Sequence, residues 1–453
     1  MRDLAFMALF LFMLINAARC LHTSTMLWAW IALCAPQQYM YGIAGALPLN
    51  KIAVIATVIS VFIDQTKRKP YIDWHILLVG LFVLQGVISY SVGLSGSDRT
   101  YYLLDKMLKI YLLCCVMTMA NRGRLQIHSM VIIICLGMGI HGALEGLKYI
   151  DSGGGHVVVA PPSIGDNNYL AMATLMVMPL LVYMFRYSES RLIRLSFAGA
   201  LLACFAGVVA TASRGGLVGM GVFGVFLFLH SRRKMATLLV IVVLAAGLAY
   251  YAPGRWLERM DTIGVADEDG SFMNRVSSWK LNTIMALDRP LVGGGYSALE
   301  DWTISDIYRQ KFHRLDSLVT SPEPTAPLAA HSIYFETLGD LGFPGLFLFL
   351  AVLFTGFRNV HHILRYTRQD ESLIWARDLA VLFRLSLIVF MVCGALLSAA
   401  YFELIYIMLT QISVLRHHLE ETVVVAKPLP GYVLAAPDAV GGIPVGSELG
   451  RYR

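Results

Sequence analysis

The stretch that decides the fold is LIRLSFAGALLACFAGVVATASRGGLVGMGVFGVFLFL, residues 192–229. It contains two apolar runs, 192–212 and 217–229, and the turn between them is only a few residues long. A helix of about 20 apolar residues crosses the roughly 30 Å hydrocarbon core of a bilayer. Because the turn is so short, the second run must return directly beside the first. The stretch therefore predicts two adjacent membrane-spanning helices.

Apolar runs of this kind recur along the whole chain. Of the 453 residues, 57% are hydrophobic and 15% are charged, and the mean hydropathy is +0.64. This composition excludes an ordinary soluble domain, and we predict an all-α polytopic membrane protein with about 12–13 transmembrane helices.

All seven cysteines lie in or beside apolar runs, so neither a disulfide framework nor a zinc site is indicated. The predicted spans are residues 4–18, 26–47 with an interruption at Pro36, 52–63, 74–92, 101–120, 127–149, 169–185, 192–212, 217–229, 236–251, 343–357, 379–399 and 402–415.

Basic residues alternate between connections and set the predicted orientation. Connections rich in arginine and lysine stay in the cytoplasm, so the other connections face outward. We predict N-terminal transmembrane helices (1–252), one large extracytoplasmic loop (253–330), C-terminal transmembrane helices (331–416) and a disordered cytoplasmic tail (417–453). The first span resembles a signal peptide but lacks a convincing cleavage site, and we expect it to be retained. The basic positions are residues 19, 67–69, 122–124, 186–194, 232–234, 358–377 and 416.

Ionisable and amide side chains within the predicted spans lie almost entirely in the outer halves. A charge inside the bilayer is costly unless it is paired or hydrated, so a one-sided set predicts a polar cavity that opens outward. The alternative for individual residues is structural. Asp105 can neutralise Lys106 or Lys109, and Glu145 and Lys148 have the spacing of an ordinary helix pair. The set comprises Arg99, Asp105, Lys106, Lys109, His141, Glu145, Lys148, Asp166, Asn168, Arg214, His331, Glu336 and Asp340.

Arg214 lies in the short outer turn Thr211-Ala212-Ser213-Arg214-Gly215-Gly216. An arginine on an outer connection goes against the usual charge distribution. Its planar fork matches the oxygens of a diphosphate, and the neighbouring glycines let a head group approach the backbone. The alternative is an arginine that reaches from a helix end to a lipid phosphate.

The sequence HSIYFETLGDLGFPG, residues 331–345, follows the long loop. His331 ends the polar segment, Glu336 and Asp340 lie at the edge of the membrane, and a Gly-Phe-Pro-Gly break precedes an apolar run. Histidine titrates near neutral pH and can take a proton from a hydroxyl, so His331 is a candidate general base. The alternative is a structural histidine.

These two motifs carry a resemblance to a known family. Together with the loop between them, they resemble the O-antigen ligase and O-antigen polymerase superfamily of bacterial inner membranes, over residues 160–415. The N-terminal third, with Leu27-Trp28-Ala29-Trp30-Ile31 and with Pro36 before Tyr41-Gly42-Ile43-Ala44, further resembles the subgroup of O-glycosylation ligases of exosortase-associated systems. The matching motifs are Gly165-Asp166-Asn167-Asn168, Ser213-Arg214-Gly215-Gly216, Asn274-Arg275, Trp279, Asp288-Arg289-Pro290-Leu291-Val292-Gly293-Gly294-Gly295 and residues 331–345.

The resemblance implies glycosyl transfer on the periplasmic side of the inner membrane. The donor would be a glycan on undecaprenyl diphosphate, and the acceptor a hydroxyl of a lipid, of another glycan or of a protein. Arg214, Arg275 and Arg289 would stabilise the departing diphosphate, and His331 would take the acceptor proton. A single displacement without an enzyme nucleophile would invert the anomeric centre. The remaining predicted substrate-binding residues are Arg99, Lys106, Asp166, Asn168, Tyr334 and Glu336.

Neither a metal nor a cofactor is predicted, and nucleic acid is not an expected partner. Asp267-Glu268-Asp269 matches an Asp-x-Asp metal site formally, but no nucleotide-binding βαβ context surrounds it, and such acids usually form a solvated loop face. The alternatives to a ligase are a polysaccharide polymerase of the same superfamily, a flippase or other transporter of lipid-linked glycan, and a membrane scaffold. A transporter would be expected to show duplicated halves and binding residues near the midplane. The sequence shows no internal repeat.

Overall fold

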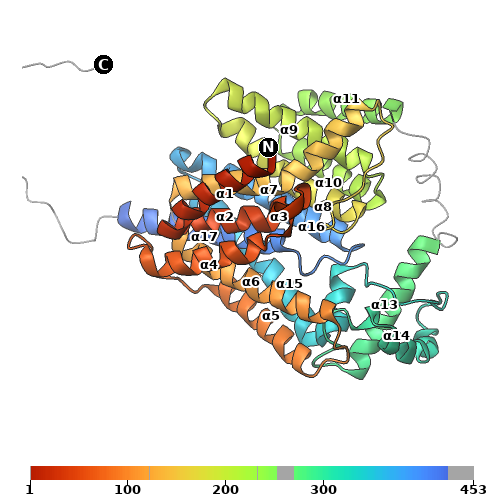
Figure 1. Ribbon diagram of the computed structural model, residues 1–453. Coiled ribbons are helices and arrows are strands. Elements are labelled where there is room, and N and C mark those ends of the chain that lie inside the picture. Colours follow the sequence, from red (N-terminus) through yellow and green to blue (C-terminus); the bar gives the residue numbers. More distant parts are fainter. Residues whose placement is uncertain (1, 122, 232, 252–269, 427–453) are drawn as a thin grey trace, which may run out of the picture.

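The computed structural model describes residues 2–121, 123–231, 233–251 and 270–426, and every regular element in these ranges is a helix (Figure 1). The predicted all-α class is confirmed. Before the long loop the elements are α1 (Arg2–Arg19), α2 (Leu21–Cys34), η1 (Pro36–Tyr39), α3 (Gly42–Ala46), α4 (Leu49–Ile63), α5 (Trp74–Ser91), α6 (Asp98–Ala120), α7 (Arg124–Asp151), α8 (Asn167–Tyr187), α9 (Arg191–Ala210), α10 (Arg214–His230) and α11 (Lys234–Tyr251). After residue 269 they are α13 (Gly270–Asp288), η3 (Ala298–Glu300), α14 (Trp302–Arg309), η4 (Phe312–Leu315), α15 (Ile333–Tyr366), η5 (Glu371–Leu373), α16 (Ile374–Gly394) and α17 (Glu403–Ala426).

Five of the described helices, α5, α7, α8, α9 and α15, are long and apolar enough to cross a membrane. Each predicted span overlaps at least one helix, although the span 26–47 covers α2, η1 and α3, and the span 379–399 extends past the end of α16. The interruption expected at Pro36 is also present, because α2 ends at Cys34, its C-cap Ala35 has a φ of 42°, and Pro36 begins a separate 3₁₀ helix. The number of helices that cross the membrane stays a prediction. Shorter apolar helices occur at Phe6–Arg19, Leu49–Ile63, Arg214–His230 and Lys234–Val243.

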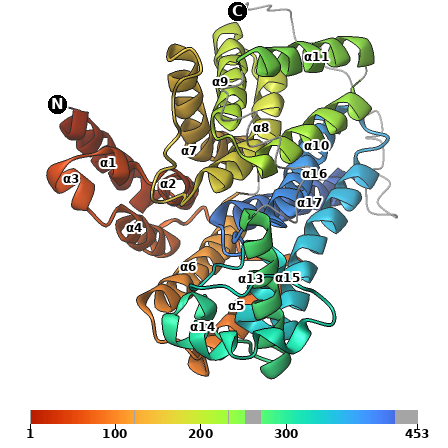
Figure 2. The same cartoon turned by 90° about the vertical axis from the view of Figure 1, so that its right-hand side faces the viewer.

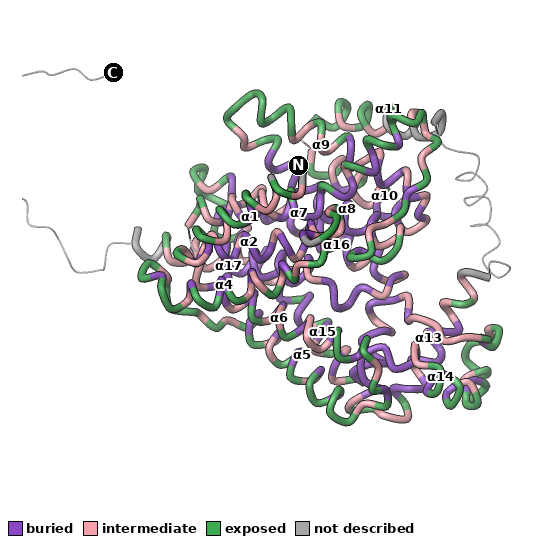
Figure 3. The backbone as a smooth tube through the Cα atoms, viewed as in Figure 1, coloured by how far each residue is buried: buried purple, intermediate pink, exposed green. Residues whose placement is uncertain are grey.

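Helix α8 forms the centre of the bundle. It is apolar on all sides, and 83% of its membrane-length window is buried, as expected for a helix without a polar face. Its neighbours are α7, α9, α10 and α16. Figure 3 shows buried residues gathered in this region, with exposed residues on the outer helices.

Small residues let α7 and α9 cross closely. A Cβ added to Gly146 would lie 1.8 Å from the carbonyl oxygen of Ala203, and one added to Gly207 would lie 2.1 Å from that of Gly142. Backbone contact of this kind is typical of helix pairs in membranes. The crossing places the outer end of α7 beside the rest of the bundle.

Helix α15 consists of two segments that meet at Gly342, where φ is 71° and ψ is −171°. Pro344 follows, and proline has no N–H to donate to the carbonyl of Asp340, four residues earlier. The break expected from the Gly-Phe-Pro-Gly sequence is therefore confirmed. Such a break leaves carbonyl groups of the first segment without partners inside the helix.

The segment 290–295 of the outer loop supplies the missing partners. The N–H of Gly294 donates to the carbonyl of Gly339, and the N–H of Gly295 donates to that of Asp340, both at 2.9 Å. Irregular backbone at membrane depth is tolerated where protein groups satisfy it. The glycine-rich part of the loop is thus hydrogen-bonded to α15 at its break.

Close packing and α5 complete this junction. A Cβ on Gly342 would lie 2.6 Å from the carbonyl oxygen of Pro290, so glycine is required there. From α5, the side-chain amide of Gln85 donates to the carbonyls of Leu291 (2.7 Å) and Leu341 (3.0 Å). Loop, α5 and α15 therefore form one hydrogen-bonded unit.

The described part of the outer loop has a small core of its own. Helix α13 packs along α15, and Trp279 stacks on Phe335 with ring centroids 5.2 Å apart. Figure 2 shows α13 and α14 gathered at one end of the molecule, beside α5 and α15. The core residues are Leu281, Ile284, Met285, Ala298, Leu299, Ile304, Tyr308 and Phe312.

Helix α17 extends past the boundary predicted at residue 417 and ends at Ala426. Ion pairs across to other elements hold this part of the helix. Arg416 contacts Asp73 at 3.2 Å, and Glu421 contacts Arg68 at 2.8 Å. The disorder predicted from residue 417 is thus wrong as far as residue 426, and residues 427–453 lie outside the described part of the chain.

Candidate functional site

Two predicted site residues, Arg275 and Asp166, come within electrostatic range of a third, His331. Their charges both act on the His331 imidazole. His331 ends the outer loop, Arg275 lies in the second turn of α13, and Asp166 is the N-cap of α8. Residues that are far apart in the sequence therefore meet at one end of the bundle.

His331 is held in a backbone conformation that histidine rarely adopts. Its φ of 48° lies in the left-handed region, and its N–H donates to the hydroxyl of Ser398 at 2.7 Å. Tyr334, one turn later, donates its hydroxyl to the carbonyl of Met391 at 3.2 Å. A left-handed backbone conformation such as that of His331 costs a residue other than glycine about 1–3 kcal/mol, and such conformations cluster at functional sites.

Hydroxyl groups of α13 hold the end of the outer loop. Ser277 donates to the carbonyl of Pro322 at 2.6 Å, and Ser278 donates to that of Ala329 at 2.7 Å. Arg275 lies within one turn of both serines. These bonds therefore explain how a residue of α13 comes to lie beside His331.

Arg214 is the first residue of α10. The helix is capped by Ser213, whose hydroxyl accepts from the N–H of Gly216 at 3.0 Å. The thiol of Cys393, near the end of α16, donates to the carbonyl of Gly215 at 3.4 Å. The turn that carries Arg214 is thus fixed against the end of α16.

The beginning of α15 packs against the same end of α16. A Cβ on Gly394 would lie 2.9 Å from the side chain of Ile333, two residues after His331. Helix α10 also contacts α8, whose N-cap is Asp166. Arg214 and His331 therefore flank one end of α16.

The surroundings of His331 favour its neutral form. Burial lowers the pKa of His331 below its ordinary value of 6.5, the positive charge of Arg275 lowers it further, and Asp166 opposes both effects in part. The neutral ring can accept a proton, as a general base must.

A second polar group extends from this site toward the N-terminal helices. Lys106 of α6 contacts Glu403 of α17 at 3.0 Å, and both side chains are largely buried. The charge of Glu336 also acts on Lys106. Tyr169 lies within electrostatic range of Glu403, Glu336 and Asp166. Lys106 is therefore linked through acids to the residues around His331.

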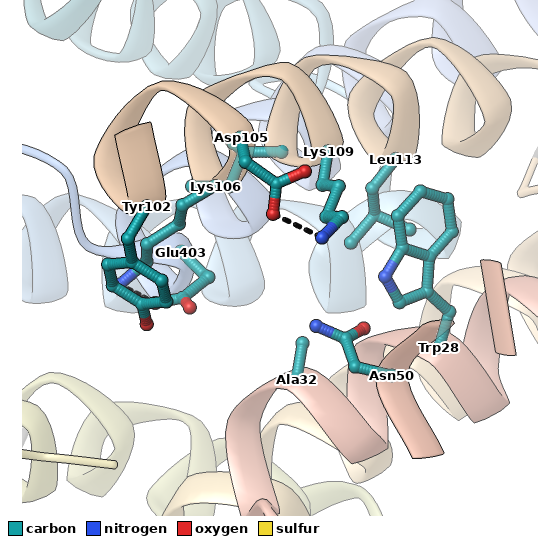
Figure 4. A pocket seen from close by; sticks show the side chains of 10 residues that line it. Trp28, Ala32, Asn50, Tyr102, Asp105, Lys106, Lys109, Leu113 and Glu403 are labelled. Carbon is teal, nitrogen blue, oxygen red and sulfur yellow. Dashed lines mark hydrogen bonds and ion pairs between the residues drawn. The ribbon is translucent and has the colours of Figure 1, made fainter. Parts of the chain in front are cut away.

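A cavity of about 70 Å³ opens beside Lys106, between α6 and the pair α2 and α4 (Figure 4). Trp28 and Asn50 face it from one side, and Lys106 and Lys109 from the other. Lys109 pairs with Asp105, so of the two structural pairings considered for Asp105 the structure shows the one with Lys109. The cavity carries balanced charge and has room for small polar groups.

Glu145 belongs to a separate cluster at the end of α7. It pairs with Lys148 at 2.5 Å, as the spacing predicted, and with His156 at 2.6 Å. This cluster satisfies its own charges and is not among the groups that act on His331.

The two buried acids of α15 bind the connection between α16 and α17. Glu336 accepts from the N–H of Ala400 at 2.8 Å, and Asp340 accepts from the hydroxyl of Tyr401 at 3.0 Å. Together with the bond between Ser398 and His331, these contacts fasten α15 to residues 398–401. Both carboxylates therefore already have a structural role.

The structure does not bring Arg289 to His331. The Arg289 guanidinium donates to the carbonyls of Gly293 (2.6 Å) and Val92 (2.5 Å), next to the junction with α15. Along α13, it lies roughly 20 Å from Arg275. Arg289 thus stabilises the loop backbone at the other end of the helix.

Arg99 and Asn168 complete the predicted set. Arg99 forms an ion pair with Glu300 at 2.8 Å, near the beginning of α6. The charges of both residues act on Glu336, so they belong to the outer edge of the same polar region. Asn168 is half-buried in the first turn of α8, beside Asp166.

Sequence reasoning missed residues 398–401. Ser398 and Ala399 were expected to end the span 379–399, and residues 400–401 to connect it to the next span, but α16 already ends at Gly394 and a turn follows. Ser398, Ala400 and Tyr401 contact the site through one hydroxyl, one backbone N–H and one phenol. A lone serine in an apolar stretch carries no signal that would have revealed this role.

No group of three or more His, Cys, Asp or Glu residues in the described ranges is arranged to hold a metal ion. The acidic triplet at residues 267–269 lies outside these ranges. The imidazole of His331 and the guanidinium of Arg275, which lies within electrostatic range of it, suit proton transfer and anion binding.

Residues 198–350 match a family model described as O-antigen ligase (Wzy_C). This match includes Arg214, Arg275 and His331, and the predicted membership of the O-antigen ligase and polymerase superfamily is confirmed for this part of the chain. Residues 1–189 match a family of unknown function (DUF5935). A comparison with curated proteins finds no match. Residues 198–350 are therefore similar to O-antigen ligases, and the five long apolar helices indicate a multi-pass membrane protein.

Proposed function

We propose that this protein transfers a glycan from undecaprenyl diphosphate to an acceptor hydroxyl at the periplasmic face of a bacterial inner membrane. The observation that carries the proposal is the position of a candidate base near cationic side chains: Arg275 lies within electrostatic range of His331, and Arg214 lies at the same end of α16. The O-antigen ligase family supports a lipid-linked glycan as the donor.

In the proposed reaction, the acceptor oxygen attacks C1 of the glycan while the bond from C1 to the diphosphate oxygen breaks. The bonding electron pair leaves with the diphosphate, and His331 takes the acceptor proton. Arg214 and Arg275 stabilise the negative charge on the leaving group. One displacement inverts the anomeric centre. We leave Arg289 out of the phosphate-binding set, because it lies roughly 20 Å from Arg275 along α13, where it binds two backbone carbonyls.

The remaining polar residues are proposed to bind the donor and the acceptor around this centre. Lys106 and Asp166 have the strongest support, since both belong to the polar group that reaches His331. Tyr334 and Glu336 contact backbone atoms of α16 and its following turn. They would therefore affect substrate binding indirectly, by fixing the shape of the site.

The test is transfer by the purified full-length protein from a defined undecaprenyl diphosphate glycan, with a lipid, a glycan and a protein acceptor supplied separately. We expect a glycosylated product with one acceptor class, in the presence of a chelator. His331→Ala should bind the donor and form no product. Movement of the donor across vesicles without any product would instead identify a transporter.

A further inference from the structure

A second pocket lies at the end of α6 that is far from Lys106. It has a volume of about 230 Å³ and is formed by the connections between α1 and α2, between α4 and α5, and between α6 and α7. From Lys106 to Ala120 the helix rises roughly 20 Å, so this pocket is separate from the site around His331. Its polar lining includes His22, Asp64, Thr66, Lys67, Arg68 and Gln126.

The acid and the histidine of this pocket are already satisfied. Asp64 accepts from the N–H (2.7 Å) and hydroxyl (2.6 Å) of Thr66 and from the N–H of Leu21 (2.8 Å). His22 uses both ring nitrogens, toward Asn121 at 2.7 Å and Ser129 at 3.1 Å. Neither side chain therefore requires a ligand.

Lys67 and Arg68 still have N–H donors available for a ligand. Lys67 donates to the carbonyl of Asp64 at 2.9 Å, and an ammonium group has three N–H donors. Arg68 contacts Glu421 at 2.8 Å, but its side chain is 57% exposed, and such exposed pairs contribute little stability. An anion that enters the pocket can therefore be bound by both cations.

Apolar side chains beside the pocket indicate the kind of anion. Phe62 and Ile63 end α4, and Leu125 lies in the first turn of α7 next to the lining residue Gln126. They are 76%, 54% and 78% exposed. A free phosphate would not use this apolar surface, whereas the acyl chains of a phospholipid would cover it. Basic pockets between helices on the cytoplasmic side are suited to anionic head groups.

We propose that the pocket lined by Lys67 and Arg68 binds the phosphate of an anionic phospholipid of the inner leaflet. The cations bind the phosphate diester, and the acyl chains lie along the ends of α4 and α7. This site lies in the N-terminal region and does not depend on the proposed glycosyl transfer.

The test is lipid binding to the purified full-length protein, measured by native mass spectrometry. Phosphatidylglycerol should bind with higher affinity than phosphatidylcholine. The double variant Lys67→Gln/Arg68→Gln should lose about tenfold in affinity for phosphatidylglycerol, because charge-assisted hydrogen bonds to the phosphate are removed. The charge-conserving variant Lys67→Arg/Arg68→Lys should stay within about threefold of wild type.

A matched control is Arg191→Gln/Arg194→Gln, which removes two exposed cations from the start of α9. It should bind phosphatidylglycerol like wild type. An equal loss in this control would show general surface electrostatics and overturn the proposal, as would unchanged binding in the first variant. Full displacement of the lipid by inorganic phosphate at equal concentration would assign the pocket to a soluble anion. Thermal unfolding without lipid confirms that each variant is folded.

Discussion

The backbone N–H of His331 donates a 2.7 Å hydrogen bond to the hydroxyl of Ser398, across the interface between α15 and the turn after α16. This bond connects the candidate base to a part of the chain that has no polar character in the sequence. It also explains how a histidine with a φ of 48° keeps one position, because its N–H is tied to a turn that Glu336 and Asp340 fix as well.

Ser398→Ala should slow transfer by about tenfold, because a lost bond of about 1 kcal/mol or more lets His331 move from its reactive position. Donor affinity and the midpoint of the pH profile should stay unchanged, and Ser398→Thr should restore the rate. Steady-state kinetics would check this. The control Ser196→Ala, at an exposed position of α9, should behave like wild type. Loss of donor binding in Ser398→Ala would contradict a positioning role.

The rate should fall as the pH drops through the pKa of His331, because the protonated ring cannot accept a proton. Burial first, and then Arg275, place this pKa below 6.5, and Asp166 opposes them. Removing the positive charge in Arg275→Gln should therefore raise the midpoint of kcat/KM against pH, and Asp166→Asn should lower it. Shifts in the same direction in the two variants would show that another group controls the profile.

Arg214→Lys should keep the charge and still lose much of the activity, since a lysine cannot form the two parallel bonds of a guanidinium. Arg214→Ala should lose nearly all of it. Both proteins should insert normally, because the N-cap bond of Ser213 does not involve the arginine side chain. Transfer assays with quantified membrane protein give the comparison. Near wild-type activity of the alanine variant would assign Arg214 to lipid contact.

Gly342→Ala should lower the thermal unfolding midpoint by a few degrees and reduce activity. The added Cβ would be 2.6 Å from the carbonyl oxygen of Pro290, and the backbone has φ 71° and ψ −171°, a region that is essentially restricted to glycine and costs other residues about 1–3 kcal/mol. Gly221→Ala in α10 is the control, because no atom lies within 4 Å of its Cβ position. Equal stability of the two variants would contradict the role assigned to the break.

Apolar runs predicted the helices well, because length and hydropathy alone determine whether a segment can cross a bilayer. The break in α15 was also predictable, since Pro344 has no N–H and Gly342 precedes it. Helix α13 was not expected. It lies in a polar loop, and its stability comes from packing against α15 and from Trp279 on Phe335. Sequence periodicity does not report such tertiary support.

The sequence analysis identified polar residues that the fold brings together when both their chemistry and their position at helix or loop ends indicated it. It did not identify the others. His331, Arg275 and Asp166 are polar residues at helix or loop ends, so their meeting required only the correct order of helices. Arg289 looked equivalent to Arg275 in sequence, but the carbonyls that it binds became neighbours only in the fold. Ser398 was missed because a single hydroxyl in an apolar stretch is common in membrane helices.

The junction between segment 290–295 and the break in α15 sets a limit on how such proteins can be recombined. The loop supplies N–H groups whose acceptors belong to a membrane helix, so neither part satisfies its backbone alone. A chimera that takes the outer loop from one relative and α15 from another would place unpaired carbonyls in the bilayer unless both glycine motifs matched. Exchange of glycan or acceptor specificity between relatives should therefore succeed when residues 270–345 are transplanted as one block.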